Sequence, residues 1–503
     1  MSPLKRLGVR RFLFAAGLLL VMRPLLIAAQ PPEPTRTPLV RVVDMNIGDS
    51  QEVALCDGKK ATVKLLAIEE TRDTICDAIR AARVKVEVNG EPVTLVSANY
   101  RLPATVAGVQ IDCSITKGYL SNSRGNPWAL EKDARLRLWP AGSSLMAPGT
   151  FTYPLRQRWF ASGTQMANEP VHVDGGERPG PRSIYYHYGE DFGGAEGMVD
   201  CVACVDGLVV MASTATLPGY KGAPIEPRYD RVDLLDDQGW FYRYSHLVAI
   251  DPAIKPGVRV KQGQKVGTLG KEGSSGGWAH LHFAIQSRQP SGNYGIQAAY
   301  AFCWEAYVKQ YAPKAIAVAR PHHLAWAGEK VTLDGTRSWC ASGKIARYEW
   351  TFTDGTKASG PTPERTYDRP GQYSEVLKVT DGQGNVAYDF AIVQILDKAH
   401  PDQIPPTMQA AYAPTFDIKP GDPVTFKVRS FRTTDGEEKW DFGDGSAPVT
   451  VKSDGCVKAL AKDGFAITTH RFEKPGDYLV RVERANKLGH TAMANLYVRV
   501  EGK

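Results

Sequence analysis

Several chemical signatures are missing from this chain of 503 residues, and each absence removes a class of site. No His-Glu-x-x-His occurs, which excludes a zinc site built on one helix with a glutamate base. The C-x-x-C of Cys201 and Cys204 has no second pair, which argues against a four-cysteine zinc knuckle. Long helical patterns are scarce, while 48 glycines and 34 prolines favour β-rich modules joined by turns.

The surroundings of the C-x-x-C favour a structural interpretation of the two cysteines. The stretch MVDCVACVDGLVVMA predicts a strand, a turn and a strand, whereas a thioredoxin-like motif needs the start of a helix. We therefore interpret Cys201 and Cys204 as partly buried strand cysteines. Eight cysteines in an exported chain can form disulfides, but they allow about a hundred connectivities, so we assign none.

An excess of charge of one sign is also absent. The chain carries 61 basic and 54 acidic side chains, a formal net charge of +7. Residues 1–29 hold five of the basic side chains and no acidic one, so the remainder has 56 against 54, or +2. This balance gives no basis for nucleic-acid binding.

The apolar run near the N-terminus is short. Phe12 to Met22 covers eleven residues, whereas a membrane-spanning helix needs about 20. A basic head precedes the run, and the small, proline-rich stretch LLIAAQPPEP follows it. This layout predicts a secretory signal at residues 1–29, cleaved near Ala29. The mature protein is then expected to be secreted, periplasmic or in the cell envelope, without membrane contact; an uncleaved anchor is the alternative.

Residues 30–150 are predicted to form a β-rich module with one helix. The stretch QEVALCDGKKATVKLL alternates apolar and polar residues on both sides of Asp57-Gly58, which is a hairpin signal. The stretch EETRDTICDAIRAARVKV follows, with apolar residues at Ile75, Ala78 and Ile79 in a helical spacing. No chemical constellation is found in this module.

The last 190 or so residues contain an internal repeat. Copy one reads YEWTFTDGT and then YDRPGQYSEVLKVTDGQGN, and copy two reads KWDFGDGS and then FEKPGDYLVRVERANKLG. The interval from Trp350 to Tyr373 is 23 residues, and the matching interval from Trp440 to Tyr478 is 38. The extra 15 residues fall around VKSDGCVKALAKDG, an inserted loop. Each copy suits a small β-sandwich.

Both copies resemble PKD-type immunoglobulin-like modules, and the W-D-F-G-D-G of copy two is the specific part. The resemblance implies one module at residues 313–397 and another at 407–502, which act as spacers or contact extracellular polymers or proteins. The acidic turns at Asp354, Asp441 and Asp444 have two interpretations, calcium ligands or tight turns. We favour the turns, because aspartate is common in them.

The histidines suggest where the chemistry lies. In the stretch YYHYGED, a strand would point His187, Gly189 and Asp191 the same way, since residues two apart share a face. His280 and His282 of HLHF share a face for the same reason. His246 ends the aromatic strand WFYRYSHLVAI. The separations along the chain are long, so only a fold can bring these pieces together.

A His, Asp and His set suits catalytic zinc, which takes three protein ligands and keeps one position for water. The candidates number five, so two imidazoles remain to exchange protons near neutral pH and to hydrogen-bond an oxyanion. Taken alone, His187 and Asp191 favour an ordinary strand, and His280 and His282 leave the two interpretations even. Together with His246 they favour a metal site. The isolated residues His172, His400 and His470 receive no role.

In chain order, HYGED, YRYSHL, IKPGVRVKQGQKVGTLGKEG and HLHF resemble the LytM and lysostaphin-type zinc metallopeptidases, which cut peptidoglycan cross-links. The resemblance covers roughly residues 185–285. It implies that His187, Asp191 and His282 bind Zn²⁺, and that His246 and His280 are the catalytic pair.

The implied fold class is mainly β and multidomain. An antiparallel β-sheet peptidase domain at 151–312, of the duplicated hybrid motif type, carries the site in a groove across the sheet. The β-rich module precedes it and two Ig-like β-sandwiches follow.

The chain departs from the family pattern just before HLHF. The family usually has Ser-Thr-Gly-Pro there, whereas EGSSGGWAHLHF has Trp278 and Ala279. Such changes affect the rim of the groove and leave the choice of substrate open.

We expect a secreted zinc metalloendopeptidase that hydrolyses peptidoglycan stem peptides or cross-bridges. The alternatives are a non-catalytic LytM-like regulator or wall-binding protein, and a protease of glycine-rich extracellular proteins. The position of residues 30–150, upstream of a hydrolase, suggests an inhibitory segment that covers the groove.

Overall fold

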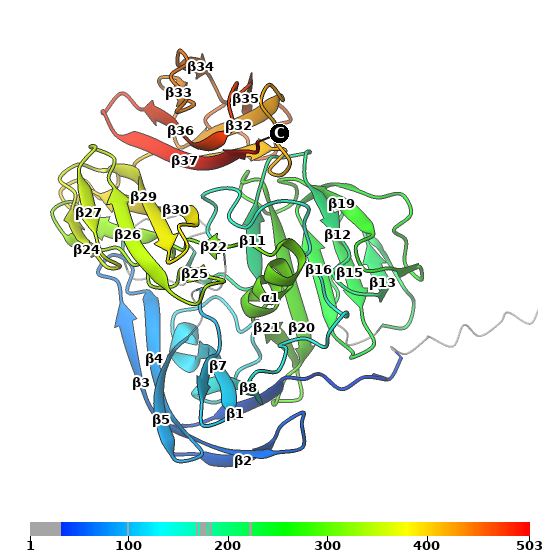
Figure 1. Cartoon of the computed structure of the whole chain (residues 1–503). Helices are drawn as coiled ribbons and strands as arrows, with labels where there is room; N and C mark the ends of the chain where they lie inside the picture. The colour runs from blue at the N-terminus through cyan, green and yellow to red at the C-terminus, as the bar shows by residue number, and fades with distance from the viewer. Residues whose placement is uncertain are drawn as a thin grey trace, which may run out of the picture.

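The computed structural model describes most of the chain, namely residues 32–97, 100–166, 170–171, 179–180, 184–220 and 224–502. The predicted signal segment and His172 lie outside these ranges. The fold is mainly β, as predicted, and its parts pack side by side (Figure 1). Within the described ranges, no helix is long and apolar enough to cross a membrane.

The described residues of the predicted N-terminal module form two antiparallel sheets that enclose an aliphatic core. Its elements are β1 (Arg41–Met45), β2 (Ser50–Ala54), β3 (Lys60–Arg72), β4 (Ile79–Val88), β5 (Glu91–Val96), β6 (Ala104–Val106), β7 (Val109–Thr116), the 3-10 helix η1 (Lys117–Leu120) and β8 (Ala134–Pro140). One sheet has the order β1-β8-β7-β6 and the other β2-β3-β4-β5. The hairpin predicted around Asp57-Gly58 is confirmed as β2 and β3.

The helix predicted from the spacing of Ile75, Ala78 and Ile79 is wrong. These residues lie in the connection between β3 and β4 and at the start of β4. The register slips where Thr71 pairs with Ala81 and Arg72 with Ile79, so one residue of β4 bulges out. The bulge at Arg80 leaves Ile79 and Ala82 both buried three residues apart, while Ile75 and Ala78 are buried in the connection before the strand, and together these positions imitate a helical spacing.

The central domain, residues 151–312, holds the two halves of the predicted site. Its elements are β9 (Pro170–Val171), β10 (Tyr185–Tyr186), β11 (Glu190–Gly193), β12 (Asp200–Val202), β13 (Gly207–Ala212), β14 (Ala215–Thr216), β15 (Val232–Leu235), β16 (Phe241–Ser245), β17 (Leu247–Ile250), β18 (Arg259–Val260), β19 (Lys265–Leu269), β20 (His280–Arg288), β21 (Tyr294–Gln297) and α1 (Tyr300–Tyr311). The main sheet runs β11-β20-β16-β15-β13-β14, with antiparallel neighbours throughout. A smaller sheet runs β12-β19-β17.

The C-x-x-C has the structural role that its surroundings predicted. Cys201 lies in β12, and Cys204 lies in the turn before β13. Both side chains are fully buried, and burial raises the pKa of both thiols. They are core residues of the central domain.

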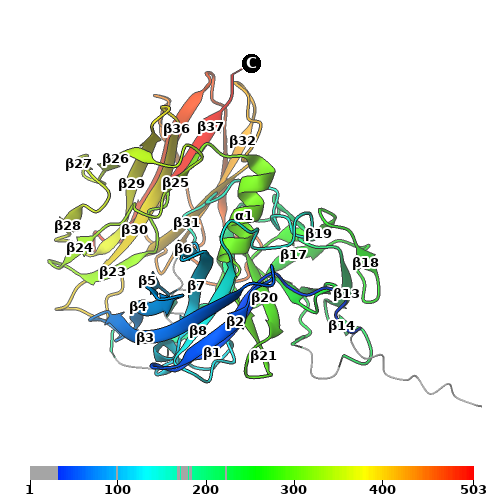
Figure 2. The same ribbon diagram turned by 60° about the horizontal axis from the view of Figure 1, so that its bottom comes forward.

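The two C-terminal modules are β-sandwich units. The first, residues 313–397, contains β22 (Ala315–Ile316), β23 (His323–Trp326), β24 (Lys330–Thr332), β25 (Trp339–Cys340), β26 (Ile345–Thr351), β27 (Lys357–Ser359), β28 (Glu364–Thr366), β29 (Gly371–Asp381) and β30 (Val386–Leu396). The second, residues 407–502, contains β31 (Thr407–Ala413), β32 (Val424–Phe431), β33 (Glu438–Asp441), β34 (Val449–Val451), β35 (Ala466–His470), β36 (Gly476–Ala485) and β37 (Thr491–Val500). The two modules are joined edge to edge, because β29 pairs in parallel with β37 (Figures 1 and 2).

The two copies of the internal repeat share a tyrosine hydrogen bond at matching positions. The hydroxyl of Tyr373 donates to the carbonyl of Arg369, and that of Tyr478 donates to the carbonyl of Lys474, each at 2.8 Å. A tyrosine hydroxyl that bonds backbone a few residues upstream is a recurrent feature of immunoglobulin-like sandwiches. The predicted insertion is confirmed as the loop between β34 and β35.

The acidic turns of the two modules make the tight-turn contacts that we favoured. Asp354, Asp441 and Asp444 each accept a hydrogen bond from the backbone N–H two residues later, at 2.9–3.0 Å. Asp354 also pairs with Arg365, and Asp444 with His470. These contacts define Asx turns.

Apolar clusters cross the boundaries between the parts. One cluster joins Ile79 and Trp128 of the N-terminal module, Tyr186 and Ala284 of the central domain, and Trp326 of the first C-terminal module. The largest cluster surrounds α1 and reaches into every other part of the chain. The N-terminal module therefore packs beside the central sheet and the first C-terminal module, as Figure 1 shows.

Candidate active site

The first half of the site comes from the chain before β11. His187 lies outside the strand, and Gly189 has φ +86°, so the chain turns before β11 begins. A Cβ on Gly189 would lie 2.7 Å from the carbonyl oxygen of Phe283 in β20. The predicted single strand face is therefore wrong for His187. The glycine permits a left-handed turn and a close approach to β20, and this turn aims His187 at Asp191.

The second half of the site comes from β20, whose two faces have different roles. Leu281, Phe283 and Ile285 point into the main apolar core. His280 and His282, on the opposite face, line a cavity. Asp191 of β11 stands directly opposite His282 in the antiparallel register, so the predicted strand alternation of HLHF is confirmed.

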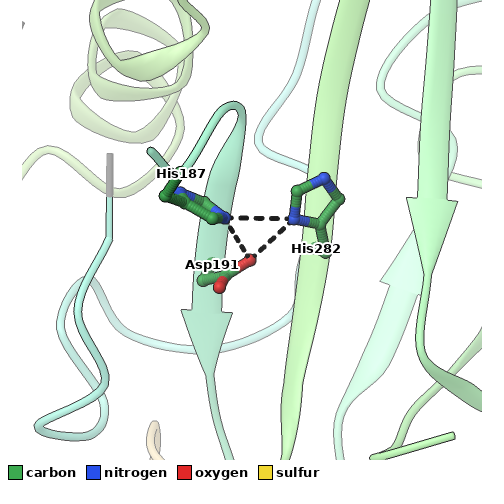
Figure 3. Close-up of side chains that lie close together, drawn as sticks. All are labelled: His187, Asp191 and His282. Carbon is green, nitrogen blue, oxygen red and sulfur yellow. Dashed lines mark hydrogen bonds and ion pairs between the residues drawn. The ribbon is translucent and has the colours of Figure 1, made fainter. Parts of the chain in front are cut away.

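Three side chains converge in the way that Figure 3 shows. His187 Nε2 lies 3.0 Å from Asp191 Oδ1, and His282 Nδ1 lies 2.9 Å from the same oxygen. The two ring nitrogens are 3.2 Å apart. Among the residues that the structure describes, His187, Asp191 and His282 form the one group arranged to hold a metal ion. The sequence predicted these three.

The electrostatics of the three residues favour a cation between them. Burial would raise the pKa of Asp191, but His187 and His280 hold it well below its usual value. Burial lowers the pKa of His282 to about 3, against the raising effect of Asp191. The ionised carboxylate of Asp191 and the neutral imidazole of His282 are forms that bind metals.

His280 is held by its own backbone. Its Nδ1 lies 3.0 Å from the carbonyl oxygen of Trp278, which can only accept, so Nδ1 carries the proton. The other nitrogen, Nε2, lies 3.5 Å from Asp191 Oδ2. Burial lowers the pKa of His280 to about 4, although Asp191 raises it. The unprotonated nitrogen therefore faces the metal group.

His246 follows β16 and adopts φ +68°, an uncommon value for a residue with a side chain. Asp230 holds this backbone, because its carboxylate accepts the His246 N–H at 2.9 Å. His246 Nδ1 lies 2.7 Å from the carbonyl oxygen of Glu272, so this nitrogen also carries the proton. The His246 and His280 rings are 4.6 Å apart, centre to centre. The predicted pair is therefore adjacent.

The site opens into a cavity of about 680 Å³ whose walls come from all parts of the chain. Of the described residues of the N-terminal module, Arg80 alone lines it. The contributions of the C-terminal modules are larger: His322, His323, Leu324, Gln372, Ile392 and Gln394 from the first, and Thr407, Met408, Ala410, Phe431, Arg432, Cys456 and Ala494 from the second. The inhibitory cover expected from residues 30–150 therefore finds no support in the cavity walls.

Sequence reasoning missed the residues that support the histidines. Asp230 comes just before β15, and nothing in its neighbourhood marks it as a partner of His246. His322 and His323 form a visible pair, but they lie at the start of a module in which no chemistry was expected. The C-terminal modules were expected to act as spacers, so their cavity residues were not considered.

Comparison with known families agrees with this geometry. Residues 185–294 match the model of peptidase family M23. The chain contains an M23 peptidase domain. Residues 312–394 and 409–498 match two models for the PKD domain, so the two C-terminal modules are PKD domains. The predicted domain boundaries lie near these matches and remain predictions.

Relatives are similar over limited regions. Collagenase ColA from Clostridium perfringens is 32% identical over 69 residues, which is 14% of this chain and 6% of the relative. A microbial collagenase from Vibrio alginolyticus is 32% identical over 83 residues, 16% of this chain and 10% of the relative. The chain thus spans about a tenth or less of the length of these curated relatives.

Among solved structures, part of this chain is similar to a mutant catalytic domain of the prophage-encoded M23 protein EnpA from Enterococcus faecalis. The identity is 25%, the match covers 22% of this chain and 74% of that chain, and the TM-score is 0.17. Csd3 from Helicobacter pylori is 15% identical, with 45% of this chain and 73% of that chain covered and a TM-score of 0.19.

Proposed function

We propose that this protein is an exported zinc metalloendopeptidase that hydrolyses peptide bonds in peptidoglycan stem peptides or cross-bridges. One observation carries the proposal. Three ligand atoms converge beside two imidazoles whose Nδ1–H groups are fixed by backbone carbonyls, and all five side chains line one cavity. The match to the M23 model supports the peptidase class.

The donor set fits Zn²⁺. Two imidazole nitrogens and one carboxylate oxygen are ligands that zinc prefers, and three protein ligands leave a position for substrate or water. His187, Asp191 and His282 would hold the ion. When bound, the ion supplies Lewis-acid chemistry: it polarises a carbonyl and acidifies water.

His280 and His246, which are not in the metal-binding group, are proposed to transfer protons and to donate hydrogen bonds. His280 accepts a proton at Nε2, because its Nδ1 is occupied by the bond to the Trp278 carbonyl. His246 presents the same tautomer on the other side of the pair and hydrogen-bonds the developing oxyanion once its Nε2 is protonated. Asp230 keeps the His246 backbone in its uncommon conformation. Both rings are buried, and both line the cavity.

The cavity wall supports a peptide that carries carboxylates. Arg80, Arg231 and Arg432 line it, and Asp191 is the one acidic side chain among its described lining residues. Two of these arginines also pair with carboxylates that do not line the cavity, Arg80 with Asp73 at 2.9 Å and Arg231 with Glu226 at 2.5 Å. A basic wall complements the free carboxylates of stem peptides. An uncharged pentaglycine bridge would form fewer favourable charge pairs with it.

Glycine-rich extracellular proteins are the second candidate substrate. The similarity to two collagenases favours this alternative. No nucleic acid is expected as a partner, and the two C-terminal modules are proposed to contact extracellular polymers or proteins. Export with removal of residues 1–29 is part of the same proposal.

The test uses the mature chain with purified peptidoglycan, a D-Ala-containing stem peptide, pentaglycine and elastin. We expect hydrolysis of peptidoglycan and of the stem peptide, abolished by a chelator and restored by Zn²⁺. Cleavage of elastin alone would transfer the assignment to glycine-rich proteins. Cleavage that a chelator does not affect would reject the metalloenzyme.

Two variants separate catalysis from metal binding. His280→Ala should retain bound zinc and lose about 10²- to 10⁴-fold in kcat, because only a proton-transfer group is removed. His282→Ala should lose the zinc itself, because a ligand is removed. Full biological function in His280→Ala would instead favour the non-catalytic regulator.

A further inference from the structure

The first half of the segment 270–279, which joins β19 to β20, is held within the central domain: Lys271 pairs with Glu196, the Gly273 N–H donates to the Tyr229 hydroxyl, and Ser275 Oγ donates to the Lys271 carbonyl. Four of the ten residues in this segment are glycines, and Gly273, Gly276 and Gly277 have φ values of +62°, +67° and +89°. Glycines lose much conformational freedom when ordered, so the second half of the segment needs contacts from outside the segment. Its end nevertheless determines where His280 lies, because the carbonyl of Trp278 accepts the bond from His280 Nδ1–H.

Gln409 of β31, in the second C-terminal module, supplies such a contact. The N–H of Ala279 donates to Gln409 Oε1 at 2.7 Å, and Gln409 Nε2 donates back to the carbonyl of Ala279 at 2.7 Å. The same Nε2 donates to Thr164 Oγ1 at 2.9 Å. Gln409 is 2% exposed and Ala279 is fully buried. One side-chain amide therefore satisfies both backbone groups of the residue that separates Trp278 from His280.

Two more side chains of the second C-terminal module hold the preceding two residues. The Trp278 ring stacks on Phe431, with ring centres 4.2 Å apart and planes 7° apart. Arg429 Nη1 donates to the carbonyl of Gly277 at 3.1 Å. Arg429 is itself fixed, because Asp454 accepts two of its N–H groups at 2.6 and 2.8 Å. Three consecutive residues are thus each held by a different side chain of this module.

The loop inserted in the second repeat copy also belongs to the contact between the second C-terminal module and residues 277–279. It supplies Asp454 to Arg429, and its Cys456 and Ala459 pack on Gly277. A Cβ on Gly277 would lie 2.8 Å from Cys456 Sγ and 3.0 Å from the carbonyl oxygen of Ala459. The insertion and the glycine-rich segment therefore fit together without space for a side chain between them.

We propose that the second C-terminal module is a positioning part of the active site, with Gln409 as its central positioning residue. Gln409 holds Ala279, and through it the Trp278 carbonyl that fixes the His280 imidazole. The module thus contributes to catalysis without touching the reacting atoms. The kinetic part of the test rests on the proposed peptidase function, whereas the structural part does not.

The experiment compares Gln409→Met and Gln409→Ala with the wild-type mature chain. Methionine keeps the length of the side chain and loses its hydrogen bonds, so it tests the contact even if the alanine variant fails to fold. We expect kcat on the stem peptide to fall about tenfold or more, with KM within about twofold and bound zinc unchanged, since His280 is displaced and the ligands are not. Hydrogen exchange at residues 277–280 should increase.

Asn495→Ala is the matched control. Asn495 is a buried amide of the same module, and it donates to the carbonyl of Ser374 at 2.6 Å without touching residues 276–279. We expect it to lower the melting temperature and to leave kcat and the exchange at 277–280 unchanged. Equal kinetics and equal exchange in the Gln409 and Asn495 variants would overturn the positioning role. An inactive wild type would reject the proposed function, and the exchange data would still decide this inference.

Discussion

Gly189 is the residue on which the first half of the site depends. Its φ of +86° belongs to the left-handed region, and β20 leaves no room for a Cβ there. The turn at this position separates His187 from the strand that carries Asp191, and it brings the two side chains to 3.0 Å. A glycine placed between two candidate ligands therefore has a backbone role in addition to its small size.

Gly189→Ala should destabilise the central domain and weaken zinc binding. Left-handed backbone costs an L-residue about 1–2 kcal/mol, and the contact with Phe283 adds to this cost. We expect zinc affinity to fall about 10- to 100-fold, as for changes that disturb the support of a ligand. Isothermal titration with Zn²⁺ measures this effect.

Gly292→Ala is the control for backbone strain alone. Gly292 has φ +83°, and a Cβ there would meet nothing within 4 Å. It should lose a similar amount of stability to strain and keep wild-type zinc affinity. Equal zinc affinity in the two variants would contradict the role given to Gly189.

At the scale of elements, β20 shows why part of the site was predictable. Its alternation places Leu281 and Phe283 in the core and His282 toward the cavity, as a two-residue period requires. The β3–β4 hairpin shows the opposite case. Its bulge at Arg80 buries Ile79 and Ala82 three residues apart, and Ile75 and Ala78 are buried in the connection before β4, so the apolar positions imitate a helix.

The acidic turn after β33 yields a prediction about pH. Burial would raise the pKa of Asp444, but hydrogen bonds from Ser446 and His470 hold it at about 2. A lowered carboxyl pKa stabilises the fold above the unfolded value of about 3.9 and ceases to do so as pH falls towards 2. Thermal melts between pH 5 and 2 should therefore show a smaller acid-induced loss in Asp444→Asn than in the wild type. Parallel curves would contradict this prediction.

At the scale of the whole molecule, the four parts depend on one another. Ile79 and Trp128 share an apolar cluster with Tyr186 and Ala284 of the central domain. The N–H of Ile79 also donates to the Tyr186 hydroxyl at 3.1 Å. Ala284 lies on the same face of β20 as His280 and His282, so the N-terminal module packs against the face of the sheet that carries the candidate site.

A chain that starts near Gly149 tests this support. Removing the N-terminal module would expose the apolar surface on which Ile79 and Trp128 pack, so we expect a lower melting temperature and stronger binding of the dye ANS. Activity should fall in parallel. Higher activity with an unchanged melting temperature would restore the inhibitory role that the sequence suggested.

The sequence by itself determined the types of residue at the site and, for HLHF, the local face. The spacing of His280 and His282 follows from strand geometry, and the repeat follows from its matched tryptophans and tyrosines. Only the tertiary structure decided that the C-terminal modules wall the cavity and that Gln409 holds Ala279. Periodicity reports which side of an element a residue occupies. Contacts between residues 130 positions apart depend on how whole modules pack, and no local pattern encodes that.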